Sequence, residues 1–247
     1  MKTVAFIPAR YGSSRFAGKP LADICGRPMI WWVFQQAKRV SEIDDVFVAT
    51  DDDRIKKVCE SLEMEVVMTS PHHNTGTDRV CEASKLIDAD IILNIQGDEP
   101  LIEPFVIKQA ITPLLQDESL SVSNLMTAID SPVDVVNFTV PKVVTNKNGD
   151  AVYLSRSPIP YPKGSLGYKY FKQVCVYGFR RDALEFFETS ERGKLEEIED
   201  IEILRFIEGG LRVKYIEVES KSIAVDTKND LKRVLGYLEQ NPHLNII

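Results

Sequence analysis

Apolar and polar positions in the first half of the chain alternate between two patterns. Short apolar runs rich in β-branched residues, typical of strands buried on both faces, occupy residues 4–7, 46–49, 66–68 and 91–95. In the segments between them, apolar residues recur at helical spacing at residues 29–40, 54–62 and 79–87. This βαβα order predicts an α/β fold in which helices cover both faces of a mostly parallel sheet.

The half of the chain after Pro113 has a different pattern. Apolar runs separated by loops rich in Pro, Asn and Gly predict strands at residues 122–129, 142–144, 152–154 and 173–179. Helical spacing returns at residues 181–187, 195–207 and 228–238. Because we find no internal repeat and no clear linker, we expect one domain over residues 1–247, with the second half inserted onto the same sheet. Two small domains are the alternative.

Composition and charge exclude several classes of protein. The formal net charge is −7, and an acidic chain lacks the basic face that broad binding to nucleic acid or to an anionic membrane requires. The apolar run before Arg10 is too short for a signal peptide, and no segment has the length of a membrane span. The four cysteines lie far apart without a CxxC motif, which favours reduced thiols buried as small apolar side chains. We therefore expect a cytoplasmic chain that binds neither nucleic acid nor membrane.

A basic segment contrasts with this acidic balance. Residues 7–20, IPARYGSSRFAGKP, carry Arg10, Arg15 and Lys19, and no Asp or Glu occurs through Ala22. The segment leaves the first predicted strand at its carboxyl end, where ligands bind in open α/β sheets. Glycines let the backbone approach an anion, while arginine and lysine bind phosphate oxygens, so we predict a polyphosphate site. The spacing matches neither GxxxxGK[ST] nor GxGxxG, and a solvated basic loop is the alternative.

Carboxylates are expected at the same edge of the sheet. Asp98 and Glu99 follow the predicted strand 91–95 in the sequence NIQGDEP. Carboxylates repel phosphates unless a hard cation lies between them, and Mg²⁺ binds one or two carboxylates together with phosphate oxygens. A strand-end turn capped by aspartate is the alternative. Asp226, in SIAVDTKNDL, also fits a helix N-cap, and spacing alone does not place it near Asp98.

Several motifs, in order along the chain, carry a resemblance to a known family: IPARYGSSR with GKPL, ATDD, TGTDR, NIQGDEP, YLSRSPIPYP, VYGF and VDT. Together they resemble the 3-deoxy-manno-octulosonate cytidylyltransferases, also called CMP-KDO synthetases, over nearly the whole chain. The resemblance implies a GT-A-like α/β nucleotidyltransferase, usually a homodimer. Such an enzyme transfers CMP from CTP to the anomeric hydroxyl of a 2-keto-3-deoxy sugar acid and releases pyrophosphate. The product would serve lipopolysaccharide or capsule synthesis.

The resemblance also implies roles for individual residues. In the half formed by residues 1–115, it assigns the binding of CTP to Ala9, Arg10, Arg15, Lys19, Thr77, Arg79 and Gln96. It assigns the cofactor Mg²⁺ to Asp98 and Asp226, which would act in catalysis with Arg10 and Lys19. The half formed by residues 116–247 would make the dimer and the sugar-acid site, with Arg156, Gln173, Tyr177, Glu202 and Ile203. We hypothesise that Mg²⁺ lowers the pKa of the sugar hydroxyl and that Asp98 accepts its proton.

Two of these positions depart from the family pattern. A histidine usually precedes the tyrosine strand, in a segment like HxGxYxY, where this chain has Gln173. Ile203 stands where the family pattern LEQLR has glutamine. A substrate hydroxyl buried without its partner costs about 1–3 kcal/mol, so both changes bear on the choice of sugar acid. Either neighbouring groups compensate and the substrate is KDO, or the substrate is a close variant such as 8-amino-KDO.

Other features receive structural interpretations. His72 and His73 are expected in a solvated loop, because no third metal ligand lies at suitable spacing. The acidic run at residues 196–202 predicts a mostly exposed helix face, with Ile198, Ile201 and Leu204 turned inward.

Two further functions stay open. A sugar-1-phosphate nucleotidyltransferase would share the fold class, but such enzymes typically open with an LxGGxGTR loop that this chain lacks. The other alternative is a catalytically silent nucleotide-binding protein. The joint presence of Arg15, Lys19, Asp98 and Asp226 argues against it.

Overall fold

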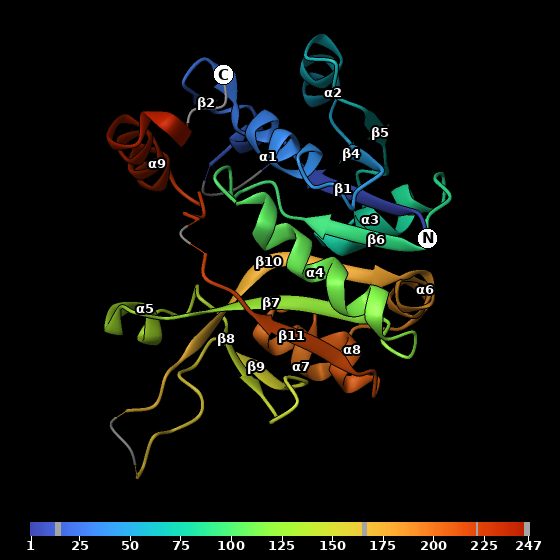
Figure 1. Cartoon of the computed structure of the whole chain (residues 1–247). Coiled ribbons are helices and arrows are strands. Elements are labelled where there is room, and N and C mark those ends of the chain that lie inside the picture. Colours follow the sequence, from blue (N-terminus) through green and yellow to red (C-terminus); the bar gives the residue numbers. More distant parts are fainter. Residues whose placement is uncertain (13–15, 165–166, 221, 245–247) are drawn as a thin grey trace.

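The computed structural model describes residues 1–12, 16–164, 167–220 and 222–244. In that part of the chain, seven strands form the body of a mixed sheet (Figure 1). Their order across the sheet is β11, β7, β10, β6, β1, β4, β5. Their bounds are β1 (Thr3–Ala9), β4 (Asp45–Thr50), β5 (Val66–Met68), β6 (Ile91–Ile95), β7 (Val122–Ala128), β10 (Phe171–Arg180) and β11 (Val213–Glu217).

Strand β10 interrupts an otherwise parallel arrangement. It is antiparallel to both its neighbours, β6 and β7, and the other neighbouring pairs in this order are parallel. Two more strands, β8 (Lys142–Thr145) and β9 (Ala151–Ser155), form a ribbon that joins the beginning of β10 through β8. The second half of the chain thus extends the sheet that the first half begins.

Helices cover both faces of this sheet. On one face, α1 (Met29–Lys38) and α4 (Pro104–Gln116) contribute to a buried apolar cluster. On the other face, a second cluster contains residues of α3 (Gly76–Ser84), α6 (Arg181–Thr189) and α8 (Leu204–Glu208). The remaining elements are α2 (Asp53–Ser61), α5 (Pro132–Val136), α7 (Lys194–Glu199), α9 (Lys228–Gln240), the hairpin of β2 (Asp23–Ile24) and β3 (Arg27–Pro28), and the 3-10 helices η1 (Lys19–Leu21) and η2 (Pro242–Leu244). Across the described residues, we find no helix with the length and apolarity needed to span a membrane.

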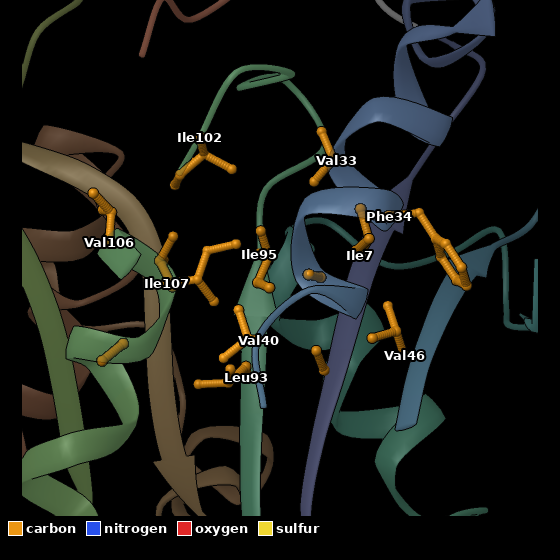
Figure 2. Close-up of a cluster of buried hydrophobic side chains, with 14 of the residues drawn as sticks. Ile7, Val33, Phe34, Val40, Val46, Leu93, Ile95, Ile102, Val106 and Ile107 are labelled. Carbon is orange, nitrogen blue, oxygen red and sulfur yellow. The ribbon is translucent and has the colours of Figure 1, made fainter. Parts of the chain in front are cut away.

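Alternation along β1 explains why its sequence is apolar throughout. Ala5 and Ile7 belong to the cluster on the α1 and α4 side, whereas Val4 and Phe6 belong to the cluster on the α3 side. Figure 2 shows Ile7 in the first of these clusters, together with Phe34 of α1. All four strand residues are fully buried, and burying a side chain the size of Ile7 stabilises a fold by about 1.5–3 kcal/mol. A strand buried on both faces has no polar side from which an alternating pattern could arise.

The C-terminal helix α9 packs against the first helix. Val234 of α9 lies with Met29 and Trp32 of α1 in a third buried cluster. The segment leading into α9 is held by a backbone hydrogen bond of 2.8 Å, in which the amide of Val225 donates to the carbonyl oxygen of Asp98. This bond brings the chain around residue 226 to the loop that follows β6.

The sequence pattern located most of these elements, with clear exceptions. The strands predicted at residues 66–68 and 91–95 coincide with β5 and β6. The prediction of one helix over residues 195–207 is wrong, because the chain forms α7 and α8 with a break at Asp200. The φ angle of Asp200 is 51°, in the left-handed region that ends a helix. Helix α4 and strand β11 have no predicted counterpart.

Burial also differs from the prediction at a few positions. Glu196 is 0% exposed, whereas Ile198 is 81% exposed, so the expected inward and outward sides of α7 are wrong for both residues. The cause is an ion pair between Glu196 and Arg205, which turns this carboxylate inward. All four cysteines are free thiols, and Cys59 and Cys81 are buried as expected, but Cys175 is only partly buried and the expectation is wrong for Cys25, which is exposed.

Candidate active site

The parallel strands β1 and β6 end at the same edge of the sheet. In their register Phe6 lies opposite Asn94, so the chain leaves Ala9 and Ile95 at neighbouring points. The loop after β1 carries the basic residues, and the loop after β6 carries Asp98. The predicted cationic and anionic segments therefore start side by side.

Lys19 connects this edge to the C-terminal segment. Its Nζ atom lies 3.3 Å from Oδ2 of Asp98 and 3.4 Å from Oδ1 of Asp226. The other oxygen of Asp98, Oδ1, is buried and accepts no hydrogen bond from the described residues. The side chains of Lys19, Asp98 and Asp226 are 18%, 25% and 38% exposed, so a ligand can reach the cluster. The fold thus brings together two carboxylates that sequence spacing does not connect.

A tight loop sets the position of Lys19. The residue begins η1 directly after Gly18, whose φ angle of 71° lies in the left-handed region. The amide of Gly18 donates a hydrogen bond of 2.8 Å to the carbonyl oxygen of Tyr11. A Cβ atom on Gly18 would lie 3.1 Å from the ring of Tyr11, so both the turn and its packing favour glycine. Arg15, predicted to bind CTP, lies outside the described residues.

Glu99, the next residue after Asp98, is buried. Only 8% of the residue is exposed, and its Oε1 atom accepts a hydrogen bond of 3.5 Å from the amide of Cys175. Burial and the charge of Asp98 raise the pKa of Glu99 above its usual value. Of the two carboxylates in NIQGDEP, Asp98 is therefore the one available to a ligand.

A pocket of about 250 Å³ opens beside the strand ends. Four of the residues that the resemblance assigns to CTP line it, and Lys19 and Thr77 lie outside its lining. The walls come from the end of β1, the loop before α3, the first turns of α3, the loop after β6 and the turn between α7 and α8. The lining residues are Pro8, Ala9, Arg10, His73, Asn74, Thr75, Gly76, Arg79, Gln96, Asp200 and Glu202.

The first turn of α3 forms one wall of the pocket. Thr75 and Asp78 make a capping box, in which each backbone amide donates to the other side chain, at 3.0 Å and 3.1 Å. Thr77 lies behind this wall, where its hydroxyl accepts a hydrogen bond of 3.1 Å from Asn94. Asn94 in turn accepts a hydrogen bond of 3.2 Å from Nε2 of Gln96. Thr77 therefore orients Gln96 through Asn94.

Arg79 supplies a fixed positive charge from the same helix. It is 4% exposed, and its Nη2 atom lies 3.3 Å from Oδ2 of Asp51. Its Nη1 atom donates to the carbonyl oxygen of Ser70 at 3.4 Å and to the hydroxyl of Thr69. A buried charge needs such partners, because an unpaired one is strongly destabilising.

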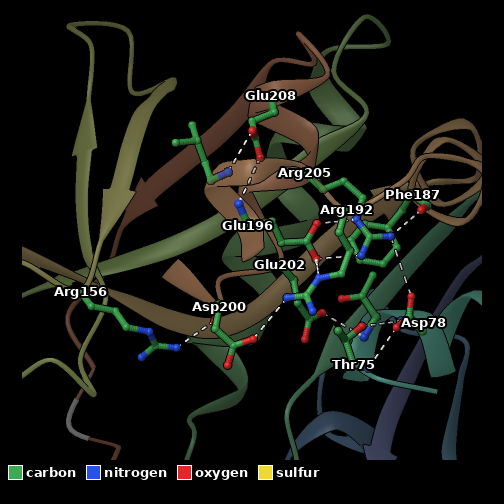
Figure 3. A network of polar contacts seen from close by, with 12 residues as sticks. Thr75, Asp78, Arg156, Phe187, Arg192, Glu196, Asp200, Glu202, Arg205 and Glu208 are labelled. Carbon is green, nitrogen blue, oxygen red and sulfur yellow. Dashed lines mark hydrogen bonds and ion pairs between the residues drawn. The ribbon is translucent and has the colours of Figure 1, made fainter. Parts of the chain in front are cut away.

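Asp200 and Glu202 form an acidic wall. Oε2 of Glu202 accepts a hydrogen bond of 3.0 Å from the amide of Thr77. Burial, which outweighs this hydrogen bond, raises the pKa of Glu202 above its usual value. Arg156 holds the turn from outside the pocket, because its guanidinium donates to the backbone carbonyl oxygens of Glu199 and, at 2.8 Å, Asp200 (Figure 3).

Comparison with known proteins identifies the family to which these residues belong. Residues 4–220 match the family model described as cytidylyltransferase. A 3-deoxy-manno-octulosonate cytidylyltransferase of Geobacter metallireducens is 43% identical over 97% of this chain and 99% of its own length. A protein of the same name from Escherichia coli is 39% identical over 97% of both chains. The chain belongs to the 3-deoxy-manno-octulosonate cytidylyltransferase family.

Solved structures agree with this membership. The structure of a CMP:2-keto-3-deoxy-manno-octonic acid synthetase complexed with CTP superposes with a TM-score of 0.93, at 39% identity, over 98% of this chain and 100% of the other. A 4-diphosphocytidyl-2C-methyl-D-erythritol synthase of Anaerococcus prevotii superposes with a TM-score of 0.65 at 18% identity, which is evidence for the fold alone. The predicted family, the α/β nucleotidyltransferase fold and the assignment as a nucleotidyltransferase are confirmed.

The residues that the resemblance assigns to the sugar acid differ in their surroundings, and some of them are buried away from the pocket. Nε2 of Gln173 donates to Oδ1 of Asn124 at 3.0 Å and to the hydroxyl of Tyr215 at 3.2 Å. Tyr177 is 8% exposed, and burial raises its pKa well above the usual value. Ile203 is 1% exposed and belongs to the apolar cluster on the α3 side of the sheet. The described pocket is therefore lined by Glu202 but not by Ile203.

Sequence reasoning missed six residues of the cytidylyltransferase pocket, namely Pro8, His73, Asn74, Thr75, Gly76 and Asp200. The prediction of a solvated loop is wrong for His73, whose side chain is 21% exposed and whose ring contacts the carboxylate of Glu82. Glu82 also accepts a hydrogen bond of 2.9 Å from the amide of Ser70, which fixes it in place. A signal existed in the sequence HHNTGTDR, because polar residues directly before a helix can reach the same sheet edge as the strand ends.

Proposed function

We propose that this cytidylyltransferase transfers CMP from CTP to the anomeric hydroxyl of 3-deoxy-manno-octulosonate (KDO) and releases pyrophosphate. The names of relatives that are 43% and 39% identical supply the sugar acid, and the complex of the 39% identical solved structure supplies CTP. The single observation that carries the proposal is the meeting of Asp98, Asp226 and Lys19 beside the pocket. Such a cluster suits a reaction between anionic substrates, in which positioning and charge neutralisation do most of the catalytic work.

Charge divides the pocket into a basic side and an acidic side. Arg10 lines the pocket on the strand-end side, and Lys19 lies in the loop that follows. Asp200 and Glu202 line it from the turn between α7 and α8. Carboxylates repel phosphate, so the triphosphate would lie toward Arg10 and Lys19, joined by Arg15. Cytidine would then face Gln96 and Arg79, and Glu202 of the acidic wall would contact the sugar acid, as the family resemblance implies.

Asp98 and Asp226 fit the requirements of a magnesium ion. Both carboxylates already contact one cationic group, the ammonium of Lys19. Oδ1 of Asp98 is buried without a hydrogen-bond donor among the described residues, as suits an oxygen that binds a metal. When bound, Mg²⁺ would neutralise charge at the α-phosphate and lower the pKa of the attacking hydroxyl.

The residues of the chain then have distinct tasks in the reaction. The anomeric oxygen forms a bond to the α-phosphorus, the bond from this phosphorus to the bridging oxygen breaks, and pyrophosphate leaves with the electron pair. Asp98 would accept the proton of the hydroxyl. Lys19 and Arg10 would offset the charge that builds up on the departing pyrophosphate. Binding both substrates in one site also removes the entropic cost of their encounter from the chemical step.

The contacts of Gln173 support KDO rather than a variant such as 8-amino-KDO. Its amide nitrogen is satisfied inside the chain by Asn124 and Tyr215, so it demands no group from the substrate. Ile203 is packed in the core, which places its methyl groups away from the pocket lining. Both observations agree with local compensation at the two departures from the family pattern.

A homodimer in the cytoplasm completes the proposal. Large apolar side chains are exposed together on and beside α5, where Val133, Val136 and Phe138 are 71%, 68% and 72% exposed. Tyr161, in the loop between β9 and β10, is 85% exposed. Burying these side chains against a second copy would remove them from water. The activated sugar would then feed lipopolysaccharide or capsule synthesis.

The proposal is tested by measuring pyrophosphate release with CTP and Mg²⁺ against four acceptors: KDO, 8-amino-KDO, a nine-carbon sialic acid and a hexose-1-phosphate. KDO as the best acceptor supports the proposal, and omission of Mg²⁺ should abolish the release. Preference for 8-amino-KDO would keep the enzyme class and overturn the sugar. Release with hexose-1-phosphate alone would mean a sugar-1-phosphate nucleotidyltransferase, and no release with any acceptor would overturn the enzymatic function.

A further inference from the structure

The sheet is irregular where β10 passes the loop that follows β6. Consecutive residues of β7 pair with Val174 and with Tyr177 of β10, so the register between these two strands shifts there. The residues of β10 in between, Cys175 and Val176, form a bulge. Bulges bend a strand and are over-represented beside active sites, where they redirect the chain. This bulge therefore raises the question of what holds it and what it holds.

The side chain of Asn124, in β7, binds the bulge on both sides of Cys175. Its Nδ2 atom donates to the carbonyl oxygen of Val176 at 2.7 Å and to that of Val174 at 3.3 Å. Its Oδ1 atom accepts a hydrogen bond of 3.0 Å from Nε2 of Gln173. Asn124 is 0% exposed, and a buried amide is costly unless it is hydrogen-bonded. Here both polar ends of the side chain have partners.

The backbone of the bulge contacts the loop after β6. The carbonyl oxygen of Cys175 accepts a hydrogen bond of 3.0 Å from the amide of Gln96. The amide of Cys175 donates to Oε1 of Glu99 at 3.5 Å. Gln96 lines the pocket, and Asp98 lies between these two contacts along the chain. One residue of the bulge thus contacts both ends of the segment 96–99.

The bulge lets β10 pair with two neighbours whose registers differ. Toward β6, Val176 pairs with Ile95, and the bond from Gln96 to Cys175 continues this register past the end of β6. Toward β7, the register changes across the same residues. A bulge disrupts the regular ladder, and buried backbone groups need partners to replace it. Asn124 provides such a partner, so the contact to Gln96 depends on it.

Gln173 fixes the orientation of Asn124. An asparagine amide has a donor end and an acceptor end, and only one orientation of Asn124 turns its Nδ2 atom toward the bulge. Gln173 donates to the Oδ1 atom, which selects that orientation. Nε2 of Gln173 also donates to the hydroxyl of Tyr215 at 3.2 Å. The network therefore crosses the neighbouring strands β10, β7 and β11 (Figure 1).

We propose that Asn124 is a positioning residue for the segment 96–99. It holds the bulge of β10 in place, and the bulge holds the backbone from which Gln96 reaches the nucleotide and Asp98 reaches the cation. Asn124 itself lies outside the pocket lining, and the family resemblance assigns it no role. The inference rests on the proposed function in one respect, the assignment of the pocket to CTP with Mg²⁺.

The test compares Asn124→Ala with Ser123→Ala, its neighbour in β7. Ser123 is also 0% exposed and donates to the carbonyl oxygen of Ala110, so both variants lose buried hydrogen bonds, but only Asn124→Ala frees the bulge. By calorimetry with Mg²⁺, we expect the Kd for CTP to rise about tenfold in Asn124→Ala and to stay within about twofold in Ser123→Ala. Wild-type affinity in Asn124→Ala, or equal losses in both variants, would overturn the proposal.

Hydrogen exchange gives a readout that a merely structural role would not move. In Asn124→Ala, exchange of the Gln96 amide should become at least about tenfold faster relative to that of Val48 in β4. A general loss of stability would speed both amides equally and would overturn the proposal.

Gln173→Met covers the case in which Asn124→Ala does not fold. Gln173 is only partly buried, and methionine removes the donor that orients Asn124. We expect the Kd for CTP to rise about threefold. If Gln173 acted on the sugar acid alone, the KM for KDO would change and the Kd for CTP would not. Where Asn124→Ala does not fold, that result would overturn the proposal.

Turnover separates this inference from the proposed function. If the wild-type protein binds CTP and Asn124→Ala weakens that binding, but no sugar acid gives pyrophosphate, the function fails and the positioning role stands. If KDO is turned over and Asn124→Ala binds CTP like the wild type, the function stands and the positioning role fails.

Discussion

Asp98 and Asp226 contact the same ammonium group, although one follows β6 and the other precedes α9. Nζ of Lys19 lies 3.3 Å from Oδ2 of Asp98 and 3.4 Å from Oδ1 of Asp226. Two carboxylates that share a site repel each other unless a cation separates them. In the protein without metal, Lys19 therefore performs the neutralising task that we propose for Mg²⁺ when the substrates bind.

Replacing Lys19 by methionine should expose this repulsion. Without divalent cations, we expect Lys19→Met to lower Tm by about 2–4 °C, since a partly exposed pair contributes about 1 kcal/mol. Added Mg²⁺ should then raise Tm more in the variant than in the wild type, because the ion meets no competing ammonium. Thermal unfolding in EDTA and in Mg²⁺ measures both effects, with Lys57→Met on the exposed side of α2 as the control. Equal Tm values for Lys19→Met and the wild type in both conditions would contradict this account.

Neutralising Asp98 should abolish most of the activity. Asp98→Asn keeps the size of the side chain but removes the charge that we assign to metal binding and to proton transfer, so we expect the rate of pyrophosphate release to fall by at least about 100-fold. Glu99→Gln is the matched control, because this neighbouring carboxylate is buried and its Oε1 atom accepts from the amide of Cys175. Its rate should stay within about threefold of the wild type. Full activity in Asp98→Asn would exclude Asp98 from both roles.

The charge of Glu202 should make stability depend on pH. Burial raises its pKa in the folded protein, so its contribution to stability is full below about pH 4.3, the usual pKa of a glutamate, and is lost as the pH rises through the raised value. Glu202→Gln fixes a neutral group that can still accept a hydrogen bond from Thr77. We expect the Tm of the variant, relative to the wild type, to increase as the pH is raised from about 4 toward neutrality.

Glu199→Gln provides the opposite case for that measurement. Although burial raises the pKa of Glu199, hydrogen bonds from the Arg156 amide and the Ser155 hydroxyl outweigh burial and lower it below the usual value. The stability that Glu199 contributes is present above about pH 4.3 and is lost as the pH falls through the lowered pKa. The Tm deficit of Glu199→Gln should therefore shrink at low pH. Parallel pH profiles for both variants would show that neither ionisation is coupled to folding.

Local patterns were sufficient for the strands of the first half and for the basic loop. Strand β6 is apolar throughout because both its faces are covered, and the loop after β1 is recognisable because its charge contrasts with the whole chain. Helix α4 was not predicted because Pro113 lies inside it, and proline usually indicates a helix boundary. The motif resemblance supplied the residue roles that no pattern could.

Tertiary contacts explain what the sequence could not predict. Glu196 was expected to be exposed because it stands in an acidic run, and only the pairing with Arg192 and Arg205 reverses this. Ile198, in the same short helix, is left exposed as a consequence. The meeting of Asp98 and Asp226 depends on the backbone bond of Val225 and on the packing of α9 against α1. Such contacts follow from the whole fold and have no local signal.

Gly76 should be required for the orientation of Gln96 rather than for folding. A Cβ atom at this position would lie 2.7 Å from Nε2 of Gln96, at the far end of a side chain that is held by its hydrogen bond to Asn94, so Gly76→Ala should break this bond and displace the amide rather than the backbone. We expect the Kd for CTP to rise about tenfold with little change in Tm. The matched control is Gly236→Ala in α9, where a Cβ atom would meet no atom within 4 Å, so the change should raise stability by about 0.5–1 kcal/mol and leave CTP binding unchanged. Calorimetry and thermal unfolding on both variants check the two expectations, and wild-type affinity for CTP in Gly76→Ala would remove Gln96 from the set of nucleotide ligands.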